Sequence, residues 1–91
     1  MLEIIWGKKF KKIYRSWSKK RPDLVDTFKD KMELFVTDPF HPSLRTHSLT
    51  GILKGLWSLR ITYEYRLIFK FMGRTKKKVL LIDIGTHQEV Y

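Results

Sequence analysis

The clearest hydrophobic pattern in the chain is a period of two along residues 57–71. Apolar side chains occupy every second position, and the alternation resumes after a short interruption near the middle. This period places alternate side chains on opposite faces of a β-strand, so the segment predicts two strands joined by a tight turn. One face is apolar and is expected to pack against helices, and the other is expected to form a cationic surface. The cationic positions are Arg60, Arg66 and Lys70.

The same alternation returns near the C-terminus, along residues 79–91. It predicts a third strand that pairs with the first two. We expect Leu80, Ile82 and Ile84 to join the core. Asp83 then lies on the side of the arginines, and His87 follows the strand.

The first half of the chain shows a different period. Residues 2–6 are short, apolar and β-branched and predict a strand beside one of the later strands. Residues 8–20 and 23–36 carry apolar side chains at helical spacing, which predicts two helices that form an antiparallel hairpin over one sheet face. Residues 38–55 contain two prolines and two glycines without a sustained period, so they predict a long loop.

These elements predict an α+β fold with one domain spanning residues 1–91. Its order is an N-terminal strand, a two-helix hairpin and a three-strand antiparallel meander. A chain of 91 residues can bury about two thirds of its unfolded surface in one core and leaves no room for a second domain.

The composition indicates what kind of partner the protein binds and in which cellular compartment it works. Nineteen Lys and Arg against nine Asp and Glu give a net charge of +10, which favours a polyanion such as nucleic acid. The chain has no cysteine, as a reducing cytoplasm permits. No apolar run is long enough to span a membrane, and the N-terminus lacks the basic charge of a signal peptide. We therefore expect a cytoplasmic protein with no membrane partner.

The three histidines are too far apart in sequence for a helical metal-binding pair, so we expect neither a metal nor another cofactor. Metal-free RNA cleavage needs a base for the 2′-hydroxyl, a cation for the charged phosphorane and an acid for the leaving 5′-oxygen. Glu64 or His47 can supply the base and His87 the acid, because imidazole changes charge near neutral pH. Arg60 and Arg66 can supply the cation, with bidentate geometry on phosphate oxygens.

The segments HSLTGILKGLWSLRITYEYRLIFKF and LLIDIGTHQEVY resemble the RelE/ParE superfamily of bacterial toxins, nearest the YafQ and YoeB branches. By this resemblance, His47 matches the histidine before the L-x-G loop and Glu64 matches an acidic turn position. Arg66 matches the arginine that stabilises the phosphate, His87 matches the C-terminal catalytic histidine, and Tyr91 matches a terminal aromatic residue.

The sequence departs from the family pattern at three positions. Arg60 replaces a histidine of the YafQ-like pattern, and Asp83 replaces an arginine expected on the last strand. Ser43 stands where YoeB-like members carry a glutamate base. Arg66 must then carry the phosphate stabilisation, and the general base stays open between Glu64 and His47.

The resemblance implies the toxin of a type II toxin-antitoxin system. Such a toxin would be a ribosome-dependent, metal-free mRNA endonuclease that acts by 2′-hydroxyl attack in the ribosomal A site and so inhibits translation. Its partners would be a cognate antitoxin, the ribosome and mRNA. The alternative is a ParE-like toxin that inhibits DNA gyrase by binding. The candidate catalytic residues are His47, Glu64, Arg66 and His87, and the candidate RNA-binding residues are Lys54, Arg60, Lys70 and Tyr91.

Overall fold

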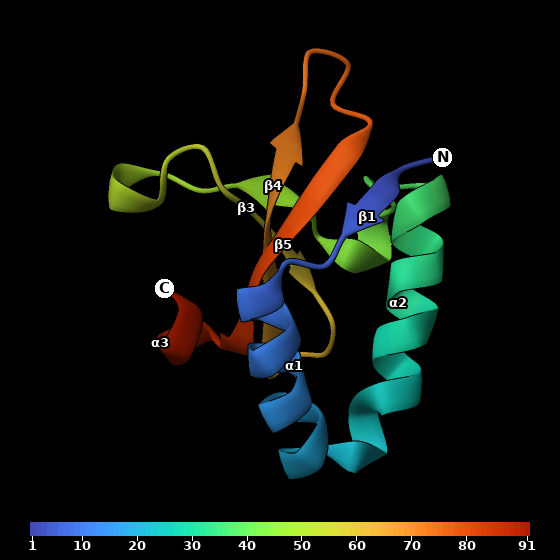
Figure 1. The fold of residues 1–91 in the computed structure, drawn as a ribbon, viewed down its shortest axis with the longest axis vertical. Helices are drawn as coiled ribbons and strands as arrows, with labels where there is room; N and C mark the ends of the chain where they lie inside the picture. Colours follow the sequence, from blue (N-terminus) through green and yellow to red (C-terminus); the bar gives the residue numbers. More distant parts are fainter.

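A computed structural model describes residues 1–91, and its centre is a five-stranded sheet in the order β1-β5-β4-β3-β2 (Figure 1). The expected meander is β3 (Trp57–Arg60), β4 (Tyr65–Met72) and β5 (Lys78–Thr86), paired antiparallel. β1 (Glu3–Ile5) pairs parallel with β5. The predicted α+β arrangement is therefore confirmed.

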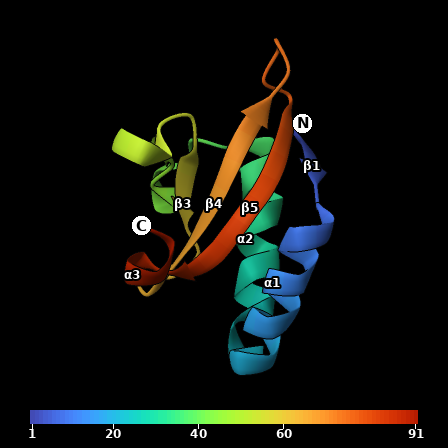
Figure 2. The same ribbon diagram turned by 60° about the vertical axis from the view of Figure 1, so that its left-hand side comes forward.

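Two helices cover one face of this sheet. α1 (Lys8–Lys20) and α2 (Val25–Thr37) are joined by a 3₁₀ turn at Pro22–Leu24 and lie side by side (Figures 1 and 2). Phe10 and Trp17 of α1 and Phe28 and Phe35 of α2 are buried against the sheet, as the helical spacing predicts. The apolar stripes of the helices and the apolar face of the meander thus form one core.

The expected core positions of the last strand are partly wrong. Val79, Leu81 and Ile84 are buried, whereas Leu80 and Ile82 are only partly buried and lie outside the core cluster. The cause is a β-bulge: Ile68 pairs with Asp83 but Phe69 pairs with Leu81, so Ile82 is an extra residue. One extra residue reverses which side chains of β5 face the core. Odd-numbered residues of β5 face the core before the bulge, and even-numbered residues face it after the bulge.

The predicted loop of residues 38–55 is more ordered than expected. It contains 3₁₀ turns at Pro42–Leu44 and Gly51–Leu53 and a two-residue edge strand, β2 (His47–Ser48), which pairs with β3. After β5 the chain forms a four-residue helix, α3 (His87–Val90), that the alternation alone did not predict. None of the helices is both long and apolar enough to span a membrane.

Candidate active site

The sheet face opposite α1 and α2 carries the candidate residues in two rows across the strands. One row follows the pairs His47–Ser58, Ser58–Ile68 and Ile68–Asp83. Residues paired directly across antiparallel strands point to the same face, and the next row along a strand is about 7 Å away. The neighbouring row contains Arg60, Arg66 and Gly85.

The arginine row concentrates positive charge at the end of β3 and β4. Arg60 and Arg66 are direct cross-strand partners, an arrangement that is unfavourable for like charges unless an anion lies between or above them. Arg66 donates through Nη1 to the carbonyls of Thr62 (2.8 Å), Tyr63 (2.9 Å) and Tyr65. These bonds close the β3–β4 turn, while Nε and Nη2 have no acceptor within the protein and remain free for a phosphate.

His47 lies on the exposed edge strand β2. Its Nδ1 is 2.8 Å from the carbonyl oxygen of Arg45, which can only accept a hydrogen bond. In the neutral ring the N–H therefore points to that carbonyl, and Nε2 carries the lone pair. The pairing with Ser58 places His47 on the same face as the arginines. The predicted loop of residues 38–55 therefore holds this histidine in a defined position.

α3 brings His87 back over the same face. The ring of His87 packs edge-on against Tyr91, with 4.3 Å between ring centroids. The Tyr91 hydroxyl donates to the hydroxyl of Ser58, which is fully buried in the His47 row. This contact connects the last residue of the chain to β3 and holds the two histidines on one side of the sheet.

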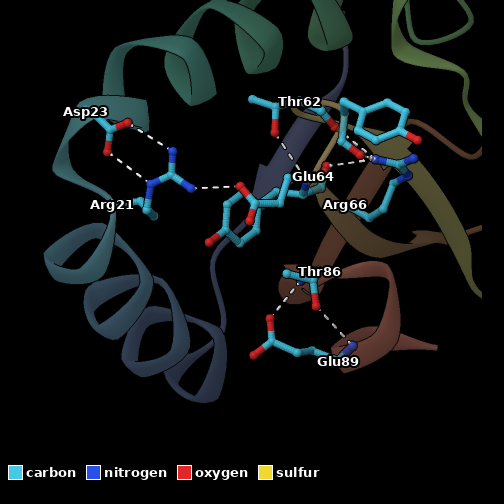
Figure 3. A network of polar contacts seen from close by, with 9 residues as sticks. Arg21, Asp23, Thr62, Glu64, Arg66, Thr86 and Glu89 are labelled. Carbon is cyan, nitrogen blue, oxygen red and sulfur yellow. Dashed lines mark hydrogen bonds and ion pairs between the residues drawn. The ribbon is translucent and has the colours of Figure 1, made fainter.

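The start of α3 is fixed by a capping box. The Thr86 hydroxyl accepts from the Glu89 backbone N–H, and a Glu89 carboxylate oxygen accepts from the Thr86 backbone N–H at 2.8 Å (Figure 3). The hydrogen bonds from Thr86 lower the pKa of Glu89. Reciprocal caps of this type specify where a helix starts. His87 is therefore the first residue of a short helix whose origin is well defined.

Glu64 lies in the β3–β4 turn but is turned away from Arg66. Its carboxylate accepts from Arg21 Nη1 at 2.8 Å, and Arg21 also donates to both carboxylate oxygens of Asp23 (Figure 3). The hydrogen bonds with Asp23 and Glu64 raise the pKa of Arg21, and the bond from Arg21 lowers the pKa of Asp23. The structure thus joins Glu64 to the end of α1 and not to the arginine row.

The other candidate residues lie around this centre. Lys70 is exposed on the same face of β4 as Arg66. Lys54 ends the 3₁₀ turn at Gly51–Leu53, in the β2–β3 connection. Asp83 is half-buried in the His47 row, its Oδ1 accepts from the Ile84 N–H, and burial raises its pKa. His47, Arg60, Arg66, His87 and Tyr91 therefore lie together, flanked by Lys70.

Sequence reasoning missed two residues that organise the site. Ser58 is a small polar residue on the nominally exposed face of β3, and its hydroxyl accepts a hydrogen bond from Tyr91, 33 positions away. Arg21 holds Glu64 from 43 positions away. For Ser58 the sequence contains no local signal of this role. For Arg21 the only local signal is its place beside Pro22 and Asp23, which indicates a polar turn. No three histidine or acidic side chains are grouped where they could hold a metal ion.

Comparison with known proteins identifies the family and the fold of this chain. A family model described as "Bacterial toxin of type II toxin-antitoxin system, YafQ" matches residues 2–91. No protein with a curated function matches the sequence.

Three solved structures share the fold across nearly the whole chain. YafQ from E. coli strain BL21(DE3) is 20% identical with a TM-score of 0.78, covering 100% of this chain and 99% of that one. The E. coli DinJ-YafQ complex gives 22% identity and a TM-score of 0.77, with coverage of 100% and 99%. The YoeB/ParE toxin from Agrobacterium tumefaciens is 23% identical with a TM-score of 0.74, and the match covers 94% of this chain and 99% of that one. At these identities the likeness establishes the fold.

Proposed function

Because the chain belongs to the YafQ family of toxins from type II toxin-antitoxin systems, we propose that it is a metal-free endoribonuclease that cleaves mRNA on the ribosome. The observation that carries the proposal is the common face of the sheet, which two arginines share with two histidines from distant parts of the chain. Such a set supplies a base, an acid and the cationic charge that cleavage of a phosphodiester requires.

In this mechanism His47 is the general base. Its Nδ1 faces the Arg45 carbonyl, which leaves the lone pair on Nε2 to accept the proton of a 2′-hydroxyl. Glu64 fits this role less well, because Arg21 holds its carboxylate on the other side of the turn. A base must lie within hydrogen-bonding reach of the proton it removes, and the orientation of Glu64 does not provide that reach.

Arg60 and Arg66 bind the phosphate under attack. The 2′-oxygen forms a bond to phosphorus while the bond to the 5′-oxygen breaks, and negative charge accumulates on the oxygens between. Arg66 is preorganised for this charge, because its Nη1 is fixed to the turn and its other nitrogens are free. Donors that do not have to reorganise contribute most to stabilising such a transition state.

His87 is the general acid. As imidazolium it donates a proton to the departing 5′-oxygen, which leaves a 2′,3′-cyclic phosphate on one fragment and a 5′-hydroxyl on the other. Its position depends on α3, which is held by the capping box and by the contact of Tyr91 with Ser58. Tyr91 therefore positions the acid and also adds an aromatic surface beside the RNA.

The proposed setting is the cytoplasm, where the ribosomal A site presents mRNA. A cognate antitoxin neutralises the toxin, in line with the solved complex of YafQ with DinJ. The net charge of +10 favours both ribosomal RNA and an acidic antitoxin. Association with either partner should weaken as salt is added.

His87→Gln tests the proposal directly. It keeps the size of the side chain but removes proton transfer, so single-turnover cleavage of mRNA on saturated ribosomes should fall by about a hundred to ten thousandfold with nearly normal binding. Lys77→Ala, at the exposed β4–β5 tip, is the control and should change only the salt dependence of association. Equal rates for His87→Gln and the wild type would refute the assignment. Normal translation with altered DNA supercoiling on induction would favour gyrase as the target.

A second pair of variants separates the two candidate bases. His47→Gln should lower the single-turnover rate by about a hundredfold or more, because it removes the proton acceptor. Glu64→Gln should leave the rate within a few-fold of wild type, because it changes only a solvent-exposed contact with Arg21. The opposite ranking would assign the base to Glu64.

A further inference from the structure

A hollow of about 520 Å³ opens beside the arginine row. Its walls come from three separated segments: α2, the 3₁₀ turn before β2, and the β3–β4 turn. We call it the flanking groove and define it by the residues that line it with polar or aromatic side chains: Lys31, Ser43, Arg45, Arg60, Thr62 and Tyr63. Arg60 belongs to both the groove and the arginine row, so the two are continuous.

The groove has a strong excess of positive charge. Lys31, Arg45 and Arg60 line it, and none of its lining residues is acidic. Both ion pairs in the structure belong to Arg21, so these three cations have no carboxylate partner. Three like charges from three elements repel one another, and an anion in the groove would relieve that repulsion.

Tyr63 adds an exposed aromatic ring to the groove, which binding of a simple anion would not require. Its side chain is at the tip of the β3–β4 turn and is 85% exposed, unusual for a large aromatic residue. The Arg60 guanidinium lies 5.2 Å from the ring centroid, and the exposure leaves the opposite face of the ring open. An aromatic ring beside unpaired cations is the combination that binds single-stranded nucleic acid, with bases on the ring and phosphates on the cations.

Arg45 connects the groove to the catalytic histidine. Its φ of 49° lies in the left-handed region, which costs a residue with a side chain of the order of 1 kcal/mol or more. The Arg45 N–H donates to the Pro42 carbonyl, and the Arg45 carbonyl faces His47 Nδ1. One strained residue thus directs a cation into the groove and orients the proposed base.

We propose that the flanking groove binds the nucleotide next to the cleaved phosphodiester. Its base stacks on Tyr63, and its phosphate binds Lys31 and Arg45. This inference rests on the proposed ribonuclease function and adds a substrate subsite to it. Because stacking accepts every base, the groove contributes affinity and positions the RNA strand, with little sequence preference of its own.

The test measures binding of a fluorescent single-stranded RNA whose 2′-hydroxyls are replaced by 2′-O-methyl groups, so that it cannot be cleaved. Tyr63→Ala should weaken binding by about five- to a hundredfold, whereas Tyr63→Phe should bind like the wild type. Lys31→Ala should lower the slope of log affinity against log salt by about 0.7, the value for one phosphate contact on a single strand. Lys29→Ala is the matched control, since Lys29 is exposed on the same helix outside the groove and should leave the slope unchanged.

Any of three results would overturn the proposal that the flanking groove binds RNA. The first is RNA affinity in Tyr63→Ala equal to that of the wild type. The second is an equal change of the salt slope in Lys31→Ala and Lys29→Ala, and the third is no saturable RNA binding by the wild type at low salt. Loss of antitoxin affinity in Tyr63→Ala with unchanged RNA affinity would also overturn it and assign the surface to a protein partner. Cleavage of ribosome-bound mRNA by the wild type is measured separately. Failure there counts against the ribonuclease proposal, while the binding series still decides the groove.

Discussion

Gly85→Ala should uncouple α3 from the site while leaving the fold intact. A methyl group at Gly85 would lie 3.1 Å from Val90 Cγ1 and 3.2 Å from Glu89 Cβ, tighter than ordinary van der Waals contact. The φ of Gly85 is not positive, so alanine fits the strand backbone and the effect comes from α3 alone. Since α3 has only four residues, we expect it to move before the sheet does.

The magnitude follows from what holds α3. Overpacking of this kind costs about 1–3 kcal/mol. Against it stand the Thr86 cap, which contributes about 1 kcal/mol, and the hydrogen bond between Tyr91 and Ser58, which contributes about 1 kcal/mol. With about 2 kcal/mol holding α3, the docked state outnumbers the undocked one about thirtyfold. A cost of about 3 kcal/mol would change that ratio to about one to five, so cleavage should fall by up to about sixfold.

The assay combines single-turnover cleavage with NMR of the His87 ring and thermal unfolding. Gly85→Ala should move the His87 resonances and lower the rate, with the melting temperature changed by only a few degrees. Gly7→Ala is the matched control, because its methyl group would lie 3.7 Å from Leu80 Cδ1, an ordinary contact. A fully active Gly85→Ala with unshifted His87 resonances would refute the reasoning.

Two further predictions concern charged residues of the same face. Arg66→Ala should lower the cleavage rate by about a hundred to a thousandfold, because it removes the phosphate contact. It should also reduce thermal stability, because it removes the hydrogen bonds to the turn carbonyls. A variant that cleaves normally would exclude Arg66 from the chemistry. Asp83→Asn should raise the melting temperature at pH 7 and have no effect near pH 3. Burial raises the pKa of Asp83, so the folded state holds its proton more tightly than the unfolded state and loses stability as the pH rises through that range. Unfolding curves at both pH values check this, and equal shifts at pH 7 and pH 3 would contradict it.

The sequence by itself determined the two long helices, the strands of the meander and the cationic character of one sheet face. The period of two along residues 57–71 and the helical spacing in residues 8–20 describe local geometry, which depends on neighbouring residues only. The alternation also predicted that Arg60, Arg66 and Lys70 share a face, and the observed register confirms it. These patterns suffice because burial of one face fixes the period in either kind of element.

Tertiary structure decided how β5 pairs with its neighbour and which side chain binds Glu64. The extra residue Ile82 exchanged the inward and outward positions of β5, and no local feature of the sequence marks that bulge. Glu64 is turned to Arg21 and not to Arg66, because the end of α1 reaches the β3–β4 turn only in the folded chain.

The position of His87 was decided in the same way. The sequence indicated an acid at the C-terminus, but its place over the sheet depends on Tyr91 reaching Ser58 and on the space left by Gly85. These contacts join residues more than twenty positions apart or require side chains of α3 to lie close to the backbone of β5. Periodicity and composition report the environment of single positions and carry no information on such pairs, so only the packed chain specifies the site.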